Sequence, residues 1–272
     1  MRPGGAELDY DGVRRYWNNA TPSILGPYMM DGFGFPAGAG RFRFRAETRI
    51  VQRLIRGVNT RGAALDLGCG AGYWTEYFAR DFKSVVAVEG SGPMVEATKQ
   101  RCSPYSNVNV IHGDVLAFEP DGRYALVFLG GMLMYLNESD VIDLLRKVIP
   151  FLEAGAIVLC RESTVRGGTL SRQGAYQVVY RSVRTYTDIF MKCGVTSVQV
   201  ERNVPYILMQ IGCELIKKWK TFAPERLQAI PIAGRLVYRG LRLGNPWATR
   251  IPGALSLAFP ELTNHFFVLR AD

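Results

Sequence analysis

Between residues 63 and 203, short apolar runs rich in Val, Ile and Leu alternate with longer stretches in which apolar residues recur at helical spacing. This alternation constrains the fold most, because parallel strands joined by helices form a sheet that is covered on both faces. The apolar runs predict strands at residues 63–68, 84–90, 108–115, 124–131, 155–163, 195–203 and 264–270. The intervening stretches predict helices at residues 72–82, 91–102, 138–152 and 183–194. We therefore expect an α/β fold with a doubly wound, mostly parallel, seven-stranded sheet and helices on both faces.

Two segments stand outside this alternation. Residues 1–58 begin with a mixture of Gly, Pro and aromatic residues and end in a helical pattern, so we expect them to form an N-terminal lid. Residues 207–262 are too long for a plain loop in a compact domain, and they predict an inserted basic cap with short amphipathic helices. The expected core then comprises residues 59–206 together with residues 263–272.

Positive charge is concentrated in the expected cap. The chain has 33 Lys and Arg against 24 Asp and Glu, a net charge of +9, and residues 208–252 hold eight of the basic residues but only two acids. Such an excess predicts acidic partners and says nothing about the fold. The cations are interleaved with Trp219, Phe222, Tyr238 and Trp247, a pattern typical of a peripheral membrane contact, of nucleic-acid binding or of a solvated cap.

The cysteines and the apolar runs indicate the cellular compartment in which the protein is expected. The five cysteines are scattered without a CxxC pair or a spacing typical of metal ligands, which favours a reduced, intracellular protein. The first residues contain no apolar segment typical of a secretory signal. The longest apolar run, residues 125–136, is too short to span a bilayer. We therefore expect a cytoplasmic protein, in which residues 208–252 provide any peripheral contact with a membrane.

The first expected strand runs into Asp66, Gly68, Gly70 and Gly72, in the pattern DxGxGxG. Glycines at a turn between a strand and a helix let the backbone approach a ligand closely. A nicotinamide-binding turn has the pattern GxGxxG, whose third glycine would stand where this chain has Tyr73. A carboxylate at Asp66 would also repel a pyrophosphate, whereas it would attract a ligand that carries an ammonium group. The turn therefore argues against a nicotinamide dehydrogenase.

This turn and the acids after the next two strands resemble the class I S-adenosylmethionine-dependent methyltransferases, over residues 60–203 and 264–270. The resemblance implies S-adenosylmethionine as cofactor, S-adenosylhomocysteine as its product, and no metal. It implies that Glu89 holds both ribose hydroxyls, and that Asp114 and the Val115 amide hold the adenine. The end of the fourth strand would pack against the adenine and methionine parts. The implied cofactor-binding residues are Asp66, Gly68, Gly70, Gly72, Trp74, Glu89, Gly90, Met94, Asp114, Val115, Leu129 and Gly130.

Two of these acids also have a plainer interpretation. Glu89 precedes the sequence Ser91-Gly92-Pro93, where it could cap the following helix, alone or in addition to binding a ligand. Asp114 could be an ordinary turn residue, and its position after the third strand is what favours the adenine. Both interpretations remain open at this point.

Candidates for the acceptor site lie near the ends of the strands and in the expected lid. Methyl transfer depends on positioning, and an amine or enolate acceptor needs no dedicated base, whereas a hydroxyl acceptor profits from one. Each candidate has a structural alternative, namely core packing for the rings and a surface ion pair with Glu162 for Arg161. The catalytic candidates are Tyr135, Tyr28 and His265, and the substrate candidates are Trp17, Tyr28, Arg161 and Tyr176.

Together, the residues and the resemblance predict an S-adenosylmethionine-dependent methyltransferase that acts on an O, N or C nucleophile of a small, hydrophobic or anionic acceptor. A lipid-linked, nucleic-acid or protein acceptor is the alternative, as is a cofactor-binding subunit without activity of its own. Nucleic acid is less favoured, because the sequence contains no known RNA-binding module. The sequence leaves the oligomeric state open.

Overall fold

The computed structural model describes residues 7–20, 35, 38–228, 231–255 and 260–271. The chain divides into two compact units. The first unit comprises Met1–Pro22, Ile55–Glu201 and His265–Asp272, and the second comprises Ser23–Leu54 and Arg202–Asn264. This division differs from the expected one, because residues 1–58 are shared between the two units instead of forming a single lid.

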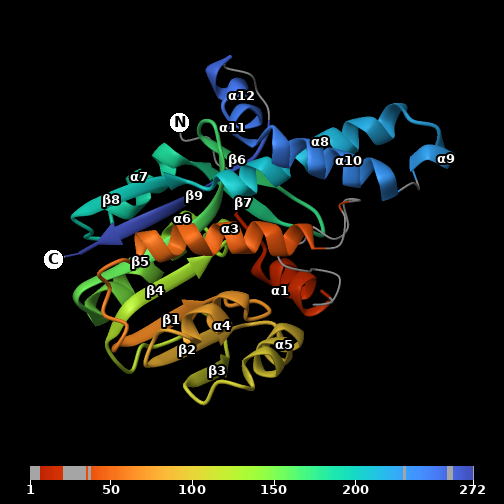
Figure 1. Cartoon of the computed structure of the whole chain (residues 1–272). Helices are drawn as coiled ribbons and strands as arrows, with labels where there is room; N and C mark the ends of the chain where they lie inside the picture. Colours follow the sequence, from red (N-terminus) through yellow and green to blue (C-terminus); the bar gives the residue numbers. More distant parts are fainter. Residues whose placement is uncertain (1–6, 21–34, 36–37, 229–230, 256–259, 272) are drawn as a thin grey trace. The chain divides into compact units, whose positions relative to one another are not determined.

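The described part of the first unit is built on one mixed sheet of nine strands (Figure 1). Its main path runs through β3 (Val108–His112), β2 (Ser84–Glu89), β1 (Ala63–Leu67), β4 (Tyr124–Gly130), β5 (Leu152–Val165), β7 (Val178–Ser182) and β6 (Thr169–Arg172). β9 (Thr263–Arg270) pairs with β5 and with β8 (Ser197–Arg202). All neighbours from β3 to β7 are parallel, whereas β7 and β6 are antiparallel. The predicted α/β class and mostly parallel sheet are confirmed.

The sheet has two strands more than expected, because residues 169–182 contain a β-hairpin. The side chains of β6 are exposed or half-buried without a clean alternation, and β7 is a short run that is buried throughout. Neither strand therefore has the alternating pattern that marks a strand in sequence. Thr164 and Val165, at the end of β5, pair with Arg181 and Ser182 of β7, so the hairpin extends the sheet at that point.

Helices cover both faces of this sheet. Alternate residues of β4 show the two layers, because successive side chains of a strand point to opposite faces. Val127 and Leu129 share a hydrophobic cluster with residues of α6 and α7, whereas Phe128 packs against Trp74 and Phe78 of α4. The helices and 3-10 turns of this unit are α1 (Tyr10–Asn18), α4 (Tyr73–Ala79), α5 (Gly92–Cys102), η2 (Leu133–Tyr135), α6 (Glu138–Val148), η3 (Ile149–Phe151) and α7 (Val183–Met191).

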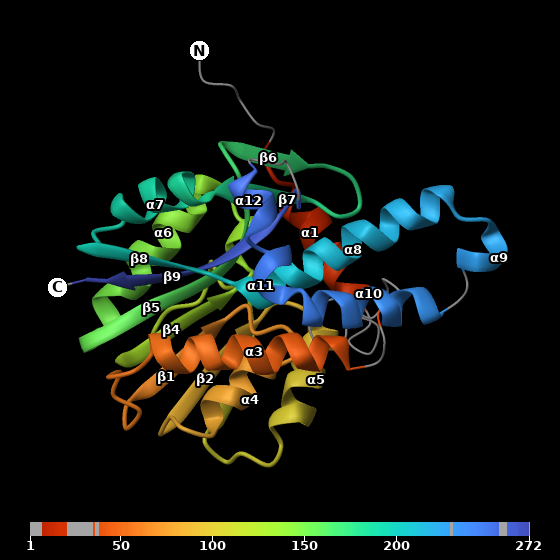
Figure 2. The same ribbon diagram turned by 45° about the horizontal axis from the view of Figure 1, so that its top comes forward.

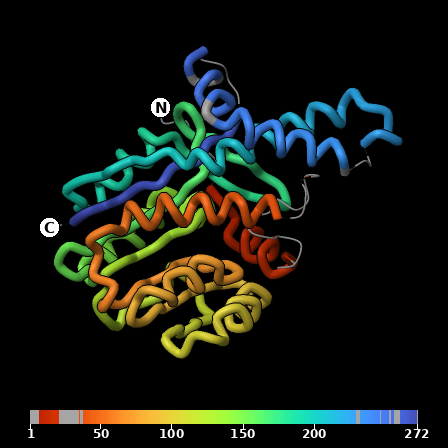
Figure 3. The backbone as a smooth tube through the Cα atoms, viewed as in Figure 1, coloured from red at the N-terminus to blue at the C-terminus, as the bar shows by residue number. Residues whose placement is uncertain are grey.

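The second unit is helical in its described part. α8 and α10 lie side by side, with α9 at the turn between them (Figures 2 and 3). Gly212 of α8 permits this packing, because a Cβ there would come within 2.7 Å of Leu241 Cδ1 and 2.5 Å of Phe35 Cζ. The helices are α3 (Ala39–Leu54), α8 (Val204–Phe222), α9 (Glu225–Gln228), α10 (Pro231–Leu243), α11 (Asn245–Ala248) and α12 (Ile251–Ala254).

A buried polar network joins α3 to the start of α8. Asn203 Nδ2 donates to Glu47 Oε1 at 2.7 Å and to Asn264 Oδ1 at 2.8 Å. Arg43 Nε lies 3.6 Å from the same Glu47 oxygen, and both charged side chains are buried. A buried ion pair of this kind persists only when further hydrogen bonds satisfy it, and Asn203 supplies one.

Candidate functional site

The parallel strands end at one edge of the sheet. Leu67 of β1 is in register with Val88 of β2 and with Leu129 of β4, so the residues that follow these strands come close together. The winding of the sheet reverses between β1 and β4, because the chain runs from β1 outward to β3 and then returns to β4. Ligands of doubly wound sheets bind at such a reversal, beyond the carboxyl ends of the strands. The candidate site therefore centres on the turn after β1.

The three glycines of this turn all have left-handed backbone, with φ of 68° at Gly68, 56° at Gly70 and 77° at Gly72. A Cβ at Gly68 would lie 2.6 Å from Met132 Cγ, and a Cβ at Gly72 would lie 2.8 Å from Thr98 Cγ2. At Gly70, in contrast, a Cβ would meet nothing within 4 Å among the described residues. The turn is therefore closely packed at its two ends and leaves its middle glycine free for the approach of a ligand.

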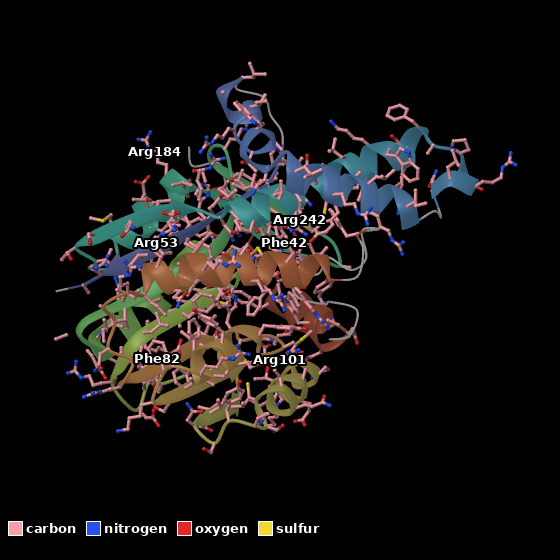
Figure 4. The ribbon with its side chains drawn as sticks, viewed as in Figure 1. Phe42, Arg53, Phe82, Arg101, Arg184 and Arg242 are labelled. Atoms are coloured by element: carbon pink, nitrogen blue, oxygen red, sulfur yellow. The ribbon has the colours of Figure 1, made fainter. Side chains whose placement is uncertain are left out.

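α5 holds this turn in place from one side. Thr98 Oγ1 donates to the carbonyl of Gly70 at 2.6 Å, and Arg101 Nε donates to the carbonyl of Ala71 at 2.7 Å. The Arg101 guanidinium also lies 3.5 Å from the centroid of the Tyr73 ring (Figure 4 labels Arg101). These two polar positions on α5 were not predicted, because each lies about 30 residues from the turn that it supports.

Asp66 is a buried carboxyl at the end of β1. It accepts a hydrogen bond of 2.6 Å from Thr75 Oγ1 of α4. Burial raises the pKa of Asp66 to about 7, and the hydrogen bond from Thr75 opposes this rise only in part. A cation brought close to this carboxyl would favour its ionised form and lower its pKa again.

Glu89, at the end of β2, braces the backbone on both sides of the site. Its Oε2 accepts from the Gly70 amide and its Oε1 accepts from the Ser91 amide, each at 2.8 Å. Burial raises the pKa of Glu89, while the backbone donors favour its charged form. Ser91 is the N-cap residue of α5, so the suggested role at the entry of this helix is confirmed. A carboxylate has about four acceptor positions, which leaves capacity for ribose hydroxyls, and that role stays a prediction.

Asp114 follows β3 and forms a turn. Its Oδ1 accepts from the Leu116 amide at 2.9 Å, and its Oδ2 lies 3.4 Å from Arg14 Nη1 of α1. The plainer interpretation of Asp114 as a turn residue is therefore confirmed, and adenine binding stays a prediction. Val115 is half-buried beside it. His112 lies beside the site, where its Nε2 hydrogen-bonds with the Gly90 carbonyl at 3.2 Å.

α1 is attached to the core at both of its ends. Ser91 Oγ donates to the Trp17 carbonyl at 2.9 Å, which ties the end of α1 to the start of α5. Near the other end, the Asn137 amide donates to the Tyr10 hydroxyl at 3.0 Å, and this hydroxyl donates to Asp140. Burial and Asp140 raise the pKa of Tyr10, so its hydroxyl remains a donor. α1 is therefore one part of the expected lid that contacts the core.

Four aromatic side chains from three segments form a cluster next to this attachment. We call Tyr16 and Trp17 of α1, Tyr135 of η2 and Tyr176 of the β6–β7 turn the aromatic cluster. Trp17 packs edge-on against Tyr135, with ring centroids 5.4 Å apart, and Tyr16 packs against Tyr176 at 5.0 Å. The hydroxyls of Tyr135 and Tyr176 are 2.9 Å apart and share a hydrogen bond. The structure thus brings together Trp17, Tyr135 and Tyr176, three of the predicted acceptor-site residues.

The phenol of Tyr135 is held in its neutral form. Burial, and next the neighbouring phenol of Tyr176, raise the pKa of Tyr135 well above its ordinary value. The pKa of Tyr16 is raised as well, again chiefly by burial. These tyrosines can therefore orient a ligand by hydrogen bonding, but they do not serve as bases near neutral pH.

Glu162 of β5 supports the loop that carries Tyr135. Its Oε1 accepts from the amides of Met132, at 3.1 Å, and Leu133, at 3.0 Å. Arg181 of β7 donates to the carbonyls of Leu133, at 3.0 Å, and Leu136, at 2.7 Å. Burial raises the pKa of Glu162 to about 7, against the effect of these donors and of the nearby arginines. The sequence did not identify Glu162 and Arg181 as a support for η2, because β5, β7 and η2 are brought together only by the fold.

Arg161 of β5 is a buried residue. A surface ion pair with Glu162 is wrong, because both side chains are buried. The charge of Arg161 does lower the pKa of Glu162. Its Nη1 lies 3.6 Å from the position that a Cβ on Gly131 would occupy, so it reaches the loop after β4. Substrate binding by Arg161 stays a prediction.

Three of the predicted cofactor-binding side chains pack in the core. Trp74 stacks on Phe78, with centroids 5.9 Å apart, and contacts Phe128 at 5.0 Å. Leu129 belongs to the hydrophobic cluster under α6 and α7, and Met94 is buried on α5. Gly130 ends β4, and a Cβ there would lie 2.7 Å from the Phe128 ring. The structure therefore shows a packing role for these positions, and contact with a cofactor remains predicted.

The remaining acceptor-site candidates do not join the cluster in the described structure. His265 Nδ1 hydrogen-bonds with Thr164 Oγ1 at 2.8 Å, in agreement with the alternative that this histidine is packed. Tyr28 lies outside the described residues. Within the described residues, no group of three or more His, Cys, Asp or Glu side chains is arranged to hold a metal ion.

The comparisons with known proteins agree with this site. Residues 64–155 match the family described as "Methyltransferase domain", and this range contains the glycine turn, Glu89, Asp114 and Tyr135. Phosphoethanolamine N-methyltransferase 3 of Arabidopsis thaliana is 26% identical over 155 residues, which are 56% of this chain and 31% of that protein. Ribosomal RNA small subunit methyltransferase A of Bacillus licheniformis is 28% identical over 178 residues, which are 62% of this chain and 59% of that protein. The matches thus span only part of the length of these relatives.

The fold is also similar to that of solved structures. Coclaurine N-methyltransferase bound to N-methylheliamine and S-adenosylhomocysteine superposes with a TM-score of 0.56 at 14% identity. The superposition covers 82% of this chain and 72% of that chain. At this identity the likeness concerns the fold alone.

Proposed function

We propose that this chain, whose residues 64–155 form a methyltransferase domain with the class I S-adenosylmethionine-dependent fold, methylates an amine nitrogen of a small molecule. The observation that carries the proposal is the aromatic cluster. It is linked to the glycine turn by a continuous path, because Ser91 bonds to the Trp17 carbonyl and to Glu89, which in turn bonds to Gly70.

The residues at the turn fit S-adenosylmethionine. Glu89 has free acceptor capacity for two ribose hydroxyls, and Asp114 keeps capacity for an adenine amino group. The buried carboxyl of Asp66 suits the ammonium of the methionine part, which would relieve the cost of its ionisation. When bound, the cofactor supplies a methyl group on a positively charged sulfur, and an aromatic face favours such a charge.

An amine acceptor suits the chemistry of the aromatic cluster. Burial raises the pKa values of Tyr135 and Tyr16, so neither phenol is ready to deprotonate a hydroxyl near neutral pH. An uncharged amine would attack the methyl carbon through its own lone pair, and the new N–C bond would form as the C–S bond breaks and leaves its electron pair on the sulfur of S-adenosylhomocysteine. The transfer itself would need no base. The amine nitrogen becomes an ammonium, which then loses its proton to water. The rings stabilise this developing positive charge, and the Tyr135–Tyr176 hydroxyl pair can orient the acceptor.

One relative supports this choice of acceptor. Phosphoethanolamine N-methyltransferase 3 is an N-methyltransferase by name. An RNA acceptor is the second candidate, and two observations favour it: the ribosomal RNA methyltransferase relative and the eight basic residues in residues 208–252.

The test uses the purified chain with methyl-labelled S-adenosylmethionine and pairs of acceptors of equal shape, one an amine and the other the matching alcohol. Ribosomal RNA serves as a third substrate. We expect label on amines only, and Tyr135→Phe should lower the rate while Tyr105→Phe, at a phenol that accepts a hydrogen bond from Arg80, should not. Label on alcohols or on RNA but not on amines would refute the amine acceptor, and no label on any substrate class would favour a subunit without activity of its own.

A further inference from the structure

Large hydrophobic side chains that stay exposed gather in the second unit. Apart from Met191 and Val200, every exposed large hydrophobic side chain in the described part of the chain lies there. A soluble surface seldom gathers so much apolar area unless it binds something. These residues are Leu215, Phe222, Leu227, Ile232, Leu236, Leu243, Trp247, Ile251 and Leu255.

α10 has two distinct faces. Val237, Tyr238 and Leu241 pack against apolar residues of the second unit. The opposite face carries Ile232, Leu236 and Leu243, which are 60%, 64% and 87% exposed. Their spacing of four and seven residues places the three on one side of the helix. This apolar stripe therefore has no covering partner among the described residues.

Basic side chains border the stripe. Arg235 and Arg239 lie on the same side of α10 and are exposed. Lys217, Lys218 and Lys220 are exposed on the last turns of α8, where Phe222 is 88% exposed. We call the exposed side of α10 that carries Ile232, Leu236, Leu243, Arg235 and Arg239 the hairpin face. The face combines large apolar side chains with an excess of positive charge.

We propose that the hairpin face docks on the surface of an anionic lipid bilayer. Its apolar side chains would enter the boundary between headgroups and acyl chains, while Arg235 and Arg239 would contact anionic headgroups. The charge is complementary to such a surface, since residues 208–252 carry eight basic and two acidic residues. None of the described helices is long and apolar enough to cross a membrane, so the contact lies at the surface.

Other occupants fit the face less well. A second copy of the chain would bring two strongly basic surfaces together, which like-charge repulsion opposes. RNA would match the positive charge of the face. It offers no apolar phase, however, so Ile232, Leu236 and Leu243 would stay exposed to water in the complex. A bilayer satisfies both features at once.

The test is vesicle flotation of the full chain with neutral phosphatidylcholine and with vesicles that contain about 30% phosphatidylglycerol. One variant removes the apolar stripe, Ile232→Ser with Leu236→Ser, and another reverses the charge, Arg235→Glu with Arg239→Glu. The control, Met191→Ser with Val200→Ser, removes exposed hydrophobic residues of the first unit. Thermal melting and binding of S-adenosylhomocysteine check that each variant is folded, and they test the proposed function separately.

We expect the unchanged chain and the control to float with anionic vesicles, and each hairpin-face variant to bind them at least about tenfold more weakly. Binding of the unchanged chain should weaken at high salt. The proposal is overturned if the unchanged chain ignores anionic vesicles or if the folded variants bind them equally well. It is also overturned if the hairpin-face variants abolish instead a dimer seen by light scattering or an RNA complex seen by gel shift.

Discussion

At the scale of single residues, the buried carboxyl of Asp66 makes stability depend on pH. Its pKa is raised to about 7 by burial, from an ordinary value of 3.8. The folded chain therefore binds this proton more tightly than the unfolded chain does. The stability that this proton contributes is fully present below the pKa that Asp66 has in the unfolded chain. It is lost as the pH rises through the pKa that Asp66 has in the folded chain.

We predict that the free energy of unfolding of the ligand-free chain falls by about 1–4 kcal/mol between about pH 5 and about pH 8. Glu162, with a pKa of about 7, acts in the same direction. Asp66→Asn and Glu162→Gln should each flatten the curve, and urea denaturation across this range measures it. A wild-type stability that is constant or rises over the range would contradict the account.

Tyr135 is expected to position the acceptor without acting as a base. Tyr135→Phe removes the hydroxyl that is 2.9 Å from that of Tyr176, so we predict a fall in kcat of about tenfold with unchanged affinity for S-adenosylhomocysteine. The pKa of Tyr135 is raised well above its ordinary value. The pH profile of the wild-type rate should therefore show no step from Tyr135 at or below the ordinary pKa of a phenol. If the wild-type rate rises with pH on the basic side of the profile, and this rise is missing from Tyr135→Phe, the phenol of Tyr135 acts as a base.

At the scale of elements, the turn after β1 requires glycine at position 72 for two reasons. Its φ is +77°, and a Cβ would lie 2.8 Å from Thr98 Cγ2. We predict that Gly72→Ala lowers the free energy of unfolding by about 1–3 kcal/mol, from backbone strain and crowding. The matched control is Gly122→Ala, where a Cβ meets no described residue within 4 Å, and thermal denaturation should show little change there. Equal melting temperatures for the two variants would contradict this explanation.

The sequence predicted the elements that have a local pattern. The strands that precede the turn, Gly90 and Asp114 are short apolar runs with clear ends, and all three were located. The hairpin of β6 and β7 was missed, because its half-exposed first strand has no regular alternation. The same holds for the site. Tyr135 and Tyr176 were each predicted as candidates, but the contact between their hydroxyls was not predicted, because it depends on that hairpin.

At the scale of the whole molecule, the division of the chain depends on contacts that no local pattern reveals. Glu47 of α3 is bound by Asn203, a residue 156 positions away, and this pair helps to place α3 in the second unit with α8. We predict that Asn203→Ala lowers the free energy of unfolding by about 2–4 kcal/mol, because it leaves the buried Glu47 and Asn264 with fewer partners. The control Asn59→Ala removes an exposed hydrogen bond to Glu153 and should cost little. Urea denaturation compares them, and similar losses would show that the buried network is not the cause.

The account as a whole rests on a cofactor held at the ends of β1, β2 and β4, with Glu89 at its centre. Calorimetric titration of S-adenosylhomocysteine into wild type, Glu89→Ala and Glu96→Ala tests this most directly, since Glu96 is an exposed acid on α5 that pairs only with Lys99 among the described residues. We predict that Glu89→Ala weakens binding by about 1–3 kcal/mol, roughly tenfold to a hundredfold, and that Glu96→Ala binds like the wild type. A folded Glu89→Ala variant that binds with wild-type affinity would contradict the placement of the site.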